Sequence, residues 1–291
     1  MRVQILVSTV VLVVLSHNLP ILAADSSDVY PFTLTDTGLI LVPVTVNGSG
    51  PYHFVLDTGS NRSAISDTLA ARLSLNPVAV TETVTSSGSL TTPVVRLETL
   101  GLGSHHTPHV LTPVLSAERL RSVHPHADGL IGQDVLIDAH YTLDYRRKRL
   151  IWLGEDTDSG AGTRLVLHRW EGRMLVELPQ SSRRGDVAWF VPDSGASTLV
   201  LFQHEGVTTI SASALPASVG TRTVTGGGQA QVAMVAKLRV GNDTLWDQPA
   251  VLVAAHVAAS TDAPRVDGLL PLSAFSSVTF NGRANYLVAR R

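Results

Sequence analysis

Residues 54–60 read FVLDTGS, an apolar strand that ends in a carboxylate, a hydroxyl and a glycine. Residues 189–196, WFVPDSGA, repeat this arrangement in the second half of the chain. Apolar and β-branched residues drive such strands into a core, so each Asp is expected at the buried end of a strand. The glycines allow a sharp turn and the close approach of another segment. Two halves that each deliver one carboxylate in this way indicate one paired site, made of Asp57 and Asp193.

The spacing of the motifs indicates an internal duplication. Each half continues with an Asp-Gly-aliphatic-aliphatic segment, DGLIG at residues 128–132 and DGLLP at residues 267–271. The step along the chain from Asp57 to Asp193 is nearly the same as the step from Gly129 to Gly268. A nearly constant offset, which marks a unit of about 130 residues, is too long for a solenoid repeat and is typical of a duplicated domain.

The segments DTGS at 57–60 and DSGA at 193–196, each with its later Asp-Gly partner, resemble the aspartic proteases of the pepsin and retropepsin type. The resemblance implies an all-β fold with short helices, in which two duplicated lobes hold the active site between them. Asp57 and Asp193 would be the catalytic dyad of an endopeptidase acting on a polypeptide substrate. The resemblance also implies supporting roles for five neighbours: Thr58, Gly59, Ser60, Ser194 and Gly195.

The chemistry of a paired carboxylate explains why two halves are needed. Two like charges in contact cannot both ionise cheaply, so the pair shares one proton. One carboxylate then takes a proton from a water while its protonated partner donates to a carbonyl oxygen. Ser60 can donate a hydrogen bond to Asp57, whereas Ala196 cannot do this for Asp193. Asp57 is therefore predicted to be the more acidic partner.

Composition limits the other possibilities. The chain has 291 residues, 44% of them hydrophobic, and a net charge of −2, which suits two lobes with their own cores and gives no argument for a nucleic-acid partner. No cysteine occurs, which excludes a disulfide framework, a thiol nucleophile and a cysteine-based zinc site. We expect no cofactor and no metal, and a monomer with pseudo-twofold lobes.

Residues 1–24 resemble a targeting segment. Arg2 precedes an apolar run over residues 3–15, and Ala23-Ala24 form a small-residue exit. This pattern favours a cleaved secretory signal and an exported, periplasmic or secreted protein. Pepsins of animals and fungi usually carry disulfides, so the lack of cysteine points toward a bacterial or otherwise minimal member of the resembled family. An uncleaved segment that tethers the chain to a membrane is the alternative. The expected lobes span residues 25–154 and 164–291, joined by a linker over residues 155–163 that is rich in Asp, Gly and Ser.

Two loops are candidates for flaps that close over a substrate, as the resemblance implies. In the first half the candidates are Ser87 and Gly88, and in the second they are Gly226, Gly227 and Gly228. The step from Gly88 to Gly227 equals that between the glycines of the two later segments, which fits the duplication. The flap tyrosine of pepsin-like enzymes is missing, since no Tyr occurs between residues 53 and 140. Ordinary hairpin loops remain the alternative.

Five histidines gather in the first half: His105, His106, His109, His124 and His126. Thr107-Pro108 would break a helix there, and no carboxylate follows at a ligand spacing, so we expect a solvated loop rather than a metal site. A metal-dependent hydrolase is the least favoured function.

Two prolines make the second half less regular. Pro192 precedes Asp193, and Pro271 stands where the first half has Gly132. Proline has no N–H, so each site is expected to lose one backbone hydrogen bond. Pro271 and the missing flap tyrosine leave a second function open, a catalytically inactive exported protein that binds a peptide in the same two-lobed fold.

Overall fold

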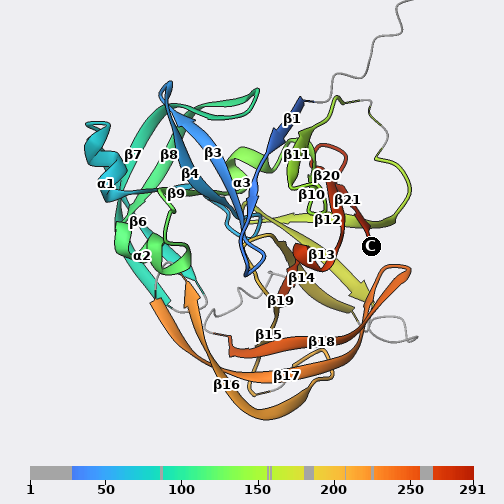
Figure 1. The fold of residues 1–291 in the computed structure, drawn as a ribbon. Helices are drawn as coiled ribbons and strands as arrows, with labels where there is room; N and C mark the ends of the chain where they lie inside the picture. The colour runs from blue at the N-terminus through green and yellow to red at the C-terminus, as the bar shows by residue number, and fades with distance from the viewer. Residues whose placement is uncertain are drawn as a thin grey trace, which may run out of the picture.

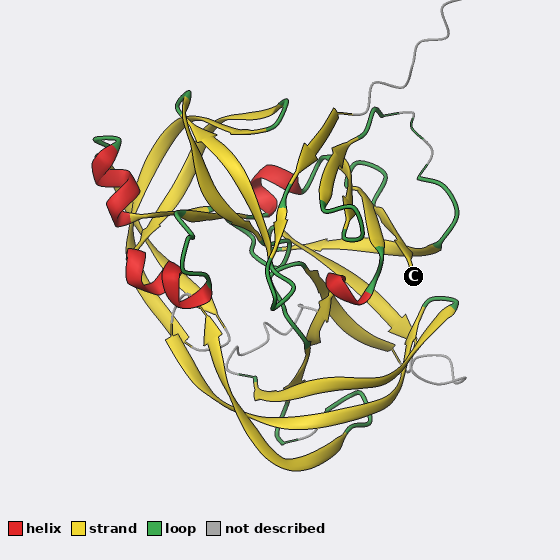
Figure 2. Cartoon of the chain, in the orientation of Figure 1, coloured by secondary structure: helices red, strands yellow, loops and turns green. Residues whose placement is uncertain are grey.

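The computed structural model describes residues 28–85, 88–155, 157, 159–179, 187–206, 208–223, 226–255 and 265–291. Within these residues the chain is mostly β-strand, with short helices, in two sheets, which confirms the predicted all-β class (Figure 2). The candidate targeting segment, residues 1–24, lies outside the described residues.

The strands of the first half are β1 (Asp28–Pro31), β2 (Thr33–Leu34), β3 (Ile40–Val46), β4 (Ser49–Leu56), β5 (Ala64–Ser66), β6 (Pro77–Thr85), β7 (Gly88–Leu102), β8 (His105–Leu115), β9 (Gly129–Ile131), β10 (His140–Asp144) and β11 (Arg149–Trp152). Those of the second half are β12 (Thr163–Trp170), β13 (Arg173–Pro179), β14 (Val187–Asp193), β15 (Leu199–Gln203), β16 (Ser213–Thr223), β17 (Gly226–Val240), β18 (Asp243–Ala254), β19 (Val266–Pro271), β20 (Ser277–Asn281) and β21 (Tyr286–Arg290). The helices are α1 (Asp67–Arg72), α2 (Ala117–Val123), α3 (Gln133–Leu136) and the 3-10 turn η1 (Leu272–Ala274).

The two halves have the same strand order. In the first half it is β3-β4-β9-β5-β8-β7-β6, and in the second it is β13-β14-β19-β15-β18-β17-β16 (Figure 1). In both, the strand that leads to the Asp runs parallel to the strand of the later Asp-Gly segment, with Phe54 opposite Gly129 and Phe190 opposite Gly268. The predicted two-lobed architecture is therefore present in the connectivity of the sheets.

Strands from both halves lie side by side in a region of sheet that joins the lobes. Its order is β1-β11-β10-β20-β21-β12, and β10 pairs directly with β20. Thr142 stands opposite Thr279, and their hydroxyls lie 2.8 Å apart in a hydrogen bond. On the same two strands, the ring of Tyr141 stacks on Phe280 at 5.1 Å between centroids. Main-chain hydrogen bonds thus hold the halves together, in addition to the covalent connection between β11 and β12.

The core explains why these segments become strands. β3 is rich in Val, Ile and Leu, and its apolar side chains are all buried except Pro43. β4 ends in the buried run Phe54-Val55-Leu56. One continuous hydrophobic cluster runs through both halves, and the largest side chains without solvent exposure include Phe54, Tyr141, Phe190 and Phe280. The core therefore includes the strands that lead to the two Asp residues and the strands that join the lobes.

Helices α1 and α2 lie at the outer side of the first half, and α3 lies nearer the middle of the molecule (Figures 1 and 2). Helix α1 follows its N-cap Ser66, whose hydroxyl accepts from the Leu69 amide at 3.1 Å. Its chain then turns through Ser74, which has a positive φ of 54°. Among the described residues, no helix is long and apolar enough to cross a bilayer.

The prediction of a loop at His105, His106 and His109 is wrong. His105, His106 and His109 belong to β8, because a long antiparallel pairing with β7 supplies backbone hydrogen bonds that the sequence pattern did not predict. His105 stacks on Trp152 at 4.5 Å, which is a packing role. In the described ranges, no three His, Asp or Glu side chains are placed to hold one metal ion.

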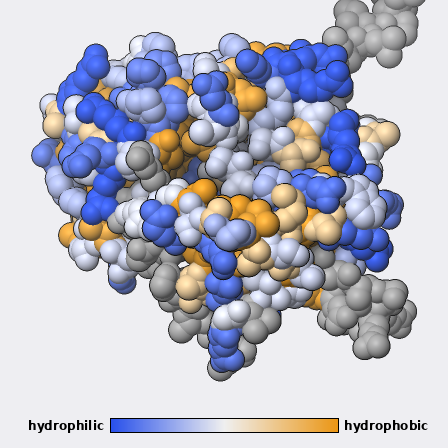
Figure 3. Space-filling model, turned by 60° about the horizontal axis from the view of Figure 1, so that its bottom comes forward, coloured by the Kyte–Doolittle hydropathy of each residue, from blue (hydrophilic) through white to orange (hydrophobic). Residues whose placement is uncertain are grey.

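The surface is mixed. Exposed large apolar side chains occur on the sheet-edge strands, among them Val78 and Val80 on β6 and Leu215 and Val219 on β16. In a view that brings the lower side of Figure 1 forward, hydrophobic residues gather near the middle of the face and hydrophilic residues mostly surround them (Figure 3). The edge strands of both halves therefore combine unpaired backbone with apolar surface.

Candidate active site

The two Asp residues occupy equivalent places at the ends of parallel strand pairs. Asp57 follows β4, and its amide donates to the carbonyl of Ile131 at 2.9 Å. Asp193 is the last residue of β14 and stands opposite Pro271 of β19. Each carboxylate is thus delivered by the pairing of an apolar strand with the later Asp-Gly segment of its own half.

The structure brings Asp57 and Asp193 face to face. A Cβ atom added to Gly195 would lie 2.7 Å from Oδ1 of Asp57 and 3.1 Å from Oδ1 of Asp193. A Cβ atom added to Gly59 would lie 2.5 Å from Cγ of Asp193. The glycine of each loop therefore lies against the carboxylate of the other half, where a side chain would collide with it. This close approach is the physical reason for Gly after the hydroxyl residue in both motifs.

Thr58 and Ser194 join the two loops through buried hydrogen bonds. Each backbone amide donates to the hydroxyl of the other residue at 3.0 Å. The hydroxyls in turn donate across the lobes, that of Thr58 to the carbonyl of Pro192 at 2.8 Å and that of Ser194 to the carbonyl of Leu56 at 2.7 Å. Four hydrogen bonds thus tie together the ends of β4 and β14.

Hydrogen bonding and burial make the two carboxylates different. Asp57 accepts hydrogen bonds from the Gly59 amide at 3.0 Å, the Ser60 amide at 3.2 Å and the Ser60 hydroxyl at 2.8 Å. Asp193 is buried and accepts from the Gly195 amide at 2.7 Å. Burial raises the pKa of Asp193 well above its ordinary value, and the negative charge of Asp57 raises it further. The surroundings of Asp193 therefore favour its protonated form.

In the first half, polar groups hold the loop that carries Asp57. The side-chain Nε2 of Gln133 donates to the carbonyl of Thr58 at 2.8 Å, and the backbone amide of Gln133 donates to the carbonyl of Ser60 at 2.9 Å. The Gly132 amide donates to the hydroxyl of Ser63 at 3.0 Å, and that hydroxyl donates to Asp134 at 2.7 Å.

The second half replaces this polar network with apolar side chains. By strand register, Leu199 takes the place of Ser63, and the buried Leu272 takes that of Gln133. Pro271 replaces Gly132, so the missing N–H coincides with a missing hydroxyl acceptor. The expected loss of a hydrogen bond at Pro271 therefore leaves no orphaned partner at Leu199. Pro192 also lacks an N–H, but its carbonyl accepts a hydrogen bond from the hydroxyl of Thr58.

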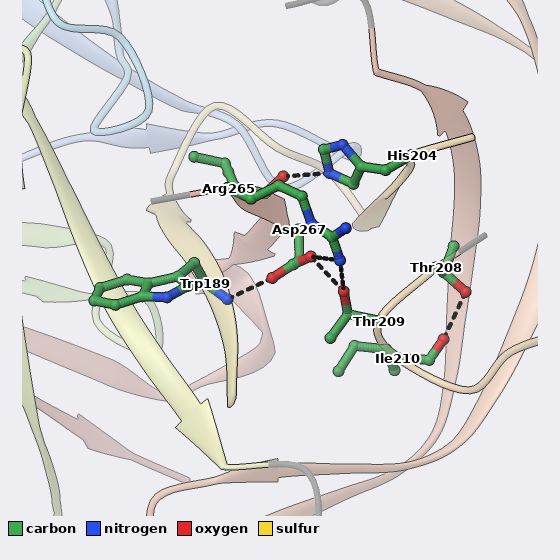
Figure 4. A network of polar contacts seen from close by, with 8 residues as sticks. Trp189, His204, Thr208, Thr209, Ile210, Arg265 and Asp267 are labelled. Atoms are coloured by element: carbon green, nitrogen blue, oxygen red, sulfur yellow. Dashed lines mark hydrogen bonds and ion pairs between the residues drawn. The ribbon is translucent and has the colours of Figure 1, made fainter. Parts of the chain in front are cut away.

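The Asp of each later segment closes the parallel strand pair. Asp128 accepts from the His53 amide at 3.0 Å, and Asp267 accepts from the Trp189 amide at 2.9 Å. These amides belong to residues four positions before Asp57 and Asp193, so the two interactions correspond. Asp267 also pairs with Arg265 at 3.3 Å and accepts from the hydroxyl of Thr209, in a network that lies beside a hydrogen bond from His204 to the backbone (Figure 4).

The flap candidates fall on two long hairpins, β6–β7 and β16–β17. Gly88 pairs with Thr85 and Gly226 with Thr223, so Gly226, rather than Gly227, is the counterpart of Gly88. Gly227 and Gly228 are already in the ladder of β17. Ser87 lies outside the described residues. The second hairpin reaches across to the first half, where β16 contacts α2.

Three residues of the site were not singled out from the sequence. Gln133 and Asp134 follow the DGLIG segment directly, and two polar residues in an otherwise apolar stretch were the available signal. Tyr145 had no such signal. It is buried beside β10, and burial raises its pKa, with a further contribution from the charge of Asp193. Packing alone brings it within electrostatic reach of the dyad.

Comparison with known families supports the same interpretation. Residues 42–135 match the family model described as aspartyl protease. This match covers Asp57, the β6–β7 hairpin and the DGLIG segment. It supports the aspartic protease family and a protease-like function. A search of curated proteins found no match to the chain.

Proposed function

We propose that the chain is an aspartic endopeptidase that hydrolyses peptide bonds with a water activated between Asp57 and Asp193. The observation that carries this proposal is the closeness of the two carboxylates. Oδ1 of Asp57 and Oδ1 of Asp193 both lie within 3.1 Å of the position that a Cβ atom on residue 195 would take. The second supporting observation is the raised pKa of Asp193, which assigns the acid and base roles.

In the proposed reaction, Asp57 takes a proton from the water as the water oxygen bonds to the peptide carbonyl carbon. Asp193 donates its proton to the carbonyl oxygen, which gives a neutral tetrahedral diol. When the C–N bond breaks, Asp57 gives its proton to the departing nitrogen and Asp193 recovers one from a hydroxyl of the diol. Proton balance is restored at the end of the cycle, and no metal or covalent intermediate is required.

The repeated strand order and the nearly constant spacing of motifs support a further part of the proposal, that two retropepsin-like units are fused in this chain. The lobes then act as one monomer, with the joining strands β10 and β20 on the approximate twofold axis. The hairpins β6–β7 and β16–β17 would be its two flaps.

Localisation rests on the sequence of the segment 1–24. We propose that this segment is a secretory signal and that the mature protein works outside the cytoplasm. Amino-terminal sequencing of the protein isolated from the native cell envelope or medium tests this. A start near Asp25 is expected, whereas an intact Met1 in a membrane fraction would support the tethered alternative.

The test of the enzymatic proposal is cleavage of an unfolded protein by residues 25–291 from pH 3 to 8, with and without pepstatin. Asp57→Asn and Asp193→Asn are each expected to abolish cleavage. Asp247→Asn is the matched control, because Asp247 is exposed on β18 and both residue types tolerate its positive φ of 50°. Cleavage that survives in either dyad variant contradicts the proposal. A folded wild type that cleaves nothing at any pH, yet binds peptides, would establish the non-catalytic binding protein instead.

A further inference from the structure

A cavity of about 310 Å³ lies beside the catalytic loop, and the proposed reaction does not use it. Its floor is formed by Gln133 and Asp134, which follow the DGLIG segment of the first half. Its rim includes the exposed Arg62, two positions after Ser60, and the exposed Glu171 from the turn between β12 and β13. Both halves of the chain therefore build it.

Two buried hydrogen-bond acceptors on residues that line this cavity have no donor among the described residues. Gln133 is fully buried, and because its Nε2 donates to Thr58, its Oε1 is left without a partner. Oδ1 of Asp134 accepts from both the amide and the hydroxyl of Ser63, at 2.8 and 2.7 Å, and its Oδ2 is likewise buried without a partner among the described residues. A buried acceptor left unpaired is destabilising, so a donor from outside the chain is favoured here.

The charges around the cavity select the kind of donor. Asp134 and Glu171 are acidic and Arg62 is basic, which leaves an excess of negative charge when Asp134 is ionised. Burial raises the pKa of Asp134, although its bonds with Ser63 and the charge of Arg62 oppose this effect. Because both Ser63 donors contact Oδ1, a proton on this carboxyl would sit on Oδ2, where a bound cation would replace it.

The wall that carries Glu171 is held firmly against the first half. The Asn61 side chain donates to the carbonyl of Glu171 at 3.4 Å. Arg169, two residues before Glu171, forms an ion pair with Asp138 at 2.8 Å and donates to the carbonyls of Ile137 at 3.2 Å and Gly282 at 2.7 Å. The cavity is therefore preformed, and its occupant does not have to order the turn.

We propose that this cavity is a specificity subsite that receives a cationic side chain, Lys or Arg, of the peptide substrate. The assignment of the occupant to a substrate rests on the proposed endopeptidase function, whereas the binding of a cation does not. Gln133 holds the carbonyls of both Thr58 and Ser60, so a side chain in the cavity belongs to a residue close to the bond that is cleaved. The volume suits one long side chain, whose methylenes can lie along the wall while the charged group lies beside the acidic residues Asp134 and Glu171.

Binding can be tested without catalysis, in the Asp57→Asn protein. n-Butylammonium, which reproduces the lysine side chain, is titrated at constant ionic strength and followed by NMR at the Gln133 side-chain amide and the Gly172 backbone amide. We expect saturable shifts that weaken as the pH falls, because protons compete for Asp134, with Arg62 and Glu171 as the other charges facing the site. 1-Butanol of the same size should produce no such shifts. Equal shifts with butanol, or none with the amine, would overturn the proposal.

Two substitutions locate the effect. Asp134→Asn keeps an oxygen that accepts from Ser63 and places an NH2 group where Oδ2 of Asp134 lies. Glu171→Gln removes a negative charge at the exposed rim, where the fold does not depend on it. Each should weaken amine binding at least fivefold. Glu205→Gln, at an exposed turn after β15, is the matched control and should bind as the parent does. Undiminished binding in both cavity variants counts against the site.

Cleavage of peptides then tests the link to the substrate. In each series of peptides, one position near the cleaved bond carries Lys, norleucine or Gln. At one of these positions, the peptide with Lys should have a kcat/KM at least tenfold higher than the peptides with norleucine or Gln. Asp134→Asn and Glu171→Gln should reduce this ratio, while Glu205→Gln keeps it. Cleavage with no preference for Lys over norleucine or Gln would overturn the subsite. Amine binding with no cleavage of any peptide would overturn the endopeptidase proposal and the substrate assignment, leaving the cation site itself standing.

Discussion

The backbone amide of Thr58 donates to the hydroxyl of Ser194 at 3.0 Å, and the backbone amide of Ser194 donates to the hydroxyl of Thr58 at the same distance. The two residues come from different halves of the chain and are far apart in the sequence. Both are buried, and each hydroxyl also donates to a carbonyl of the opposite strand. The position of each carboxylate therefore depends on the other half.

Removing one hydroxyl from this arrangement should destabilise the protein. Thr58→Val leaves the Ser194 amide and the Pro192 carbonyl without a partner, and we expect a loss of about 2–4 kcal/mol in the free energy of unfolding. Urea unfolding followed by circular dichroism measures it. Thr221→Val is the control, since the Thr221 hydroxyl makes one hydrogen bond on the exposed surface of β16. A loss for Thr58→Val as small as that of an ordinary surface substitution, below about 0.5 kcal/mol, would show that the hydrogen bonds across the lobes do not support the fold.

The raised pKa of Asp193 predicts how stability changes with pH. A carboxyl whose pKa is higher in the folded state contributes stability below the unfolded pKa of about 3.9, and this contribution is lost as the pH rises through the folded pKa. Asn does not titrate, so Asp193→Asn does not lose this stability as the pH rises. Between the unfolded and the folded pKa, the free energy of unfolding of the variant should increase relative to wild type by about 1.4 kcal/mol for each pH unit. Thermal unfolding of both proteins from pH 4 to 8 measures the gain, and a constant difference over that range would contradict it.

Glycine at position 195 should be essential for activity rather than for folding. Gly195→Ala places a Cβ 2.7 Å from the Asp57 carboxylate, which must move away from its partner. A displacement of this size should lower kcat/KM at least 100-fold. Gly220→Ala is the matched control, because nothing lies within 4 Å of its added Cβ. Activity within threefold of wild type in Gly195→Ala would show that the carboxylates do not need their present separation.

The hydrogen bond from the Ser60 hydroxyl to Asp57 should hold this carboxylate in the position that the proposed reaction needs. Ser60→Ala removes this donor at 2.8 Å, so kcat/KM should fall by about tenfold, the effect expected from losing one hydrogen bond to a charged group. The Ser60 amide still donates to the same carboxylate, so the fold should be retained. A kcat/KM for Ser60→Ala within twofold of wild type would show that the Ser60 hydroxyl does not position Asp57.

Much of the fold followed from local patterns. The apolar runs before Asp57 and Asp193 predicted strands, which the structure contains as β4 and β14. The loop predicted at His105, His106 and His109 was wrong, because pairing of β8 with β7 outweighed the local effect of Pro108. His124 and His126 do lie outside helices and strands. Local preferences are overridden where a long ladder supplies the backbone hydrogen bonds.

The sequence by itself determined that each half ends an apolar strand in a carboxylate, a hydroxyl and a glycine, because residue type and strand periodicity are local properties. Tertiary structure decided the distances between the halves, the burial of Asp193 and the replacement of the Ser63 network by Leu199 and Pro271. It also decided the cavity beside Gln133, whose wall comes from the turn at Glu171. Contacts between residues that are far apart in the sequence depend on how the sheets pack, and no local pattern encodes that packing.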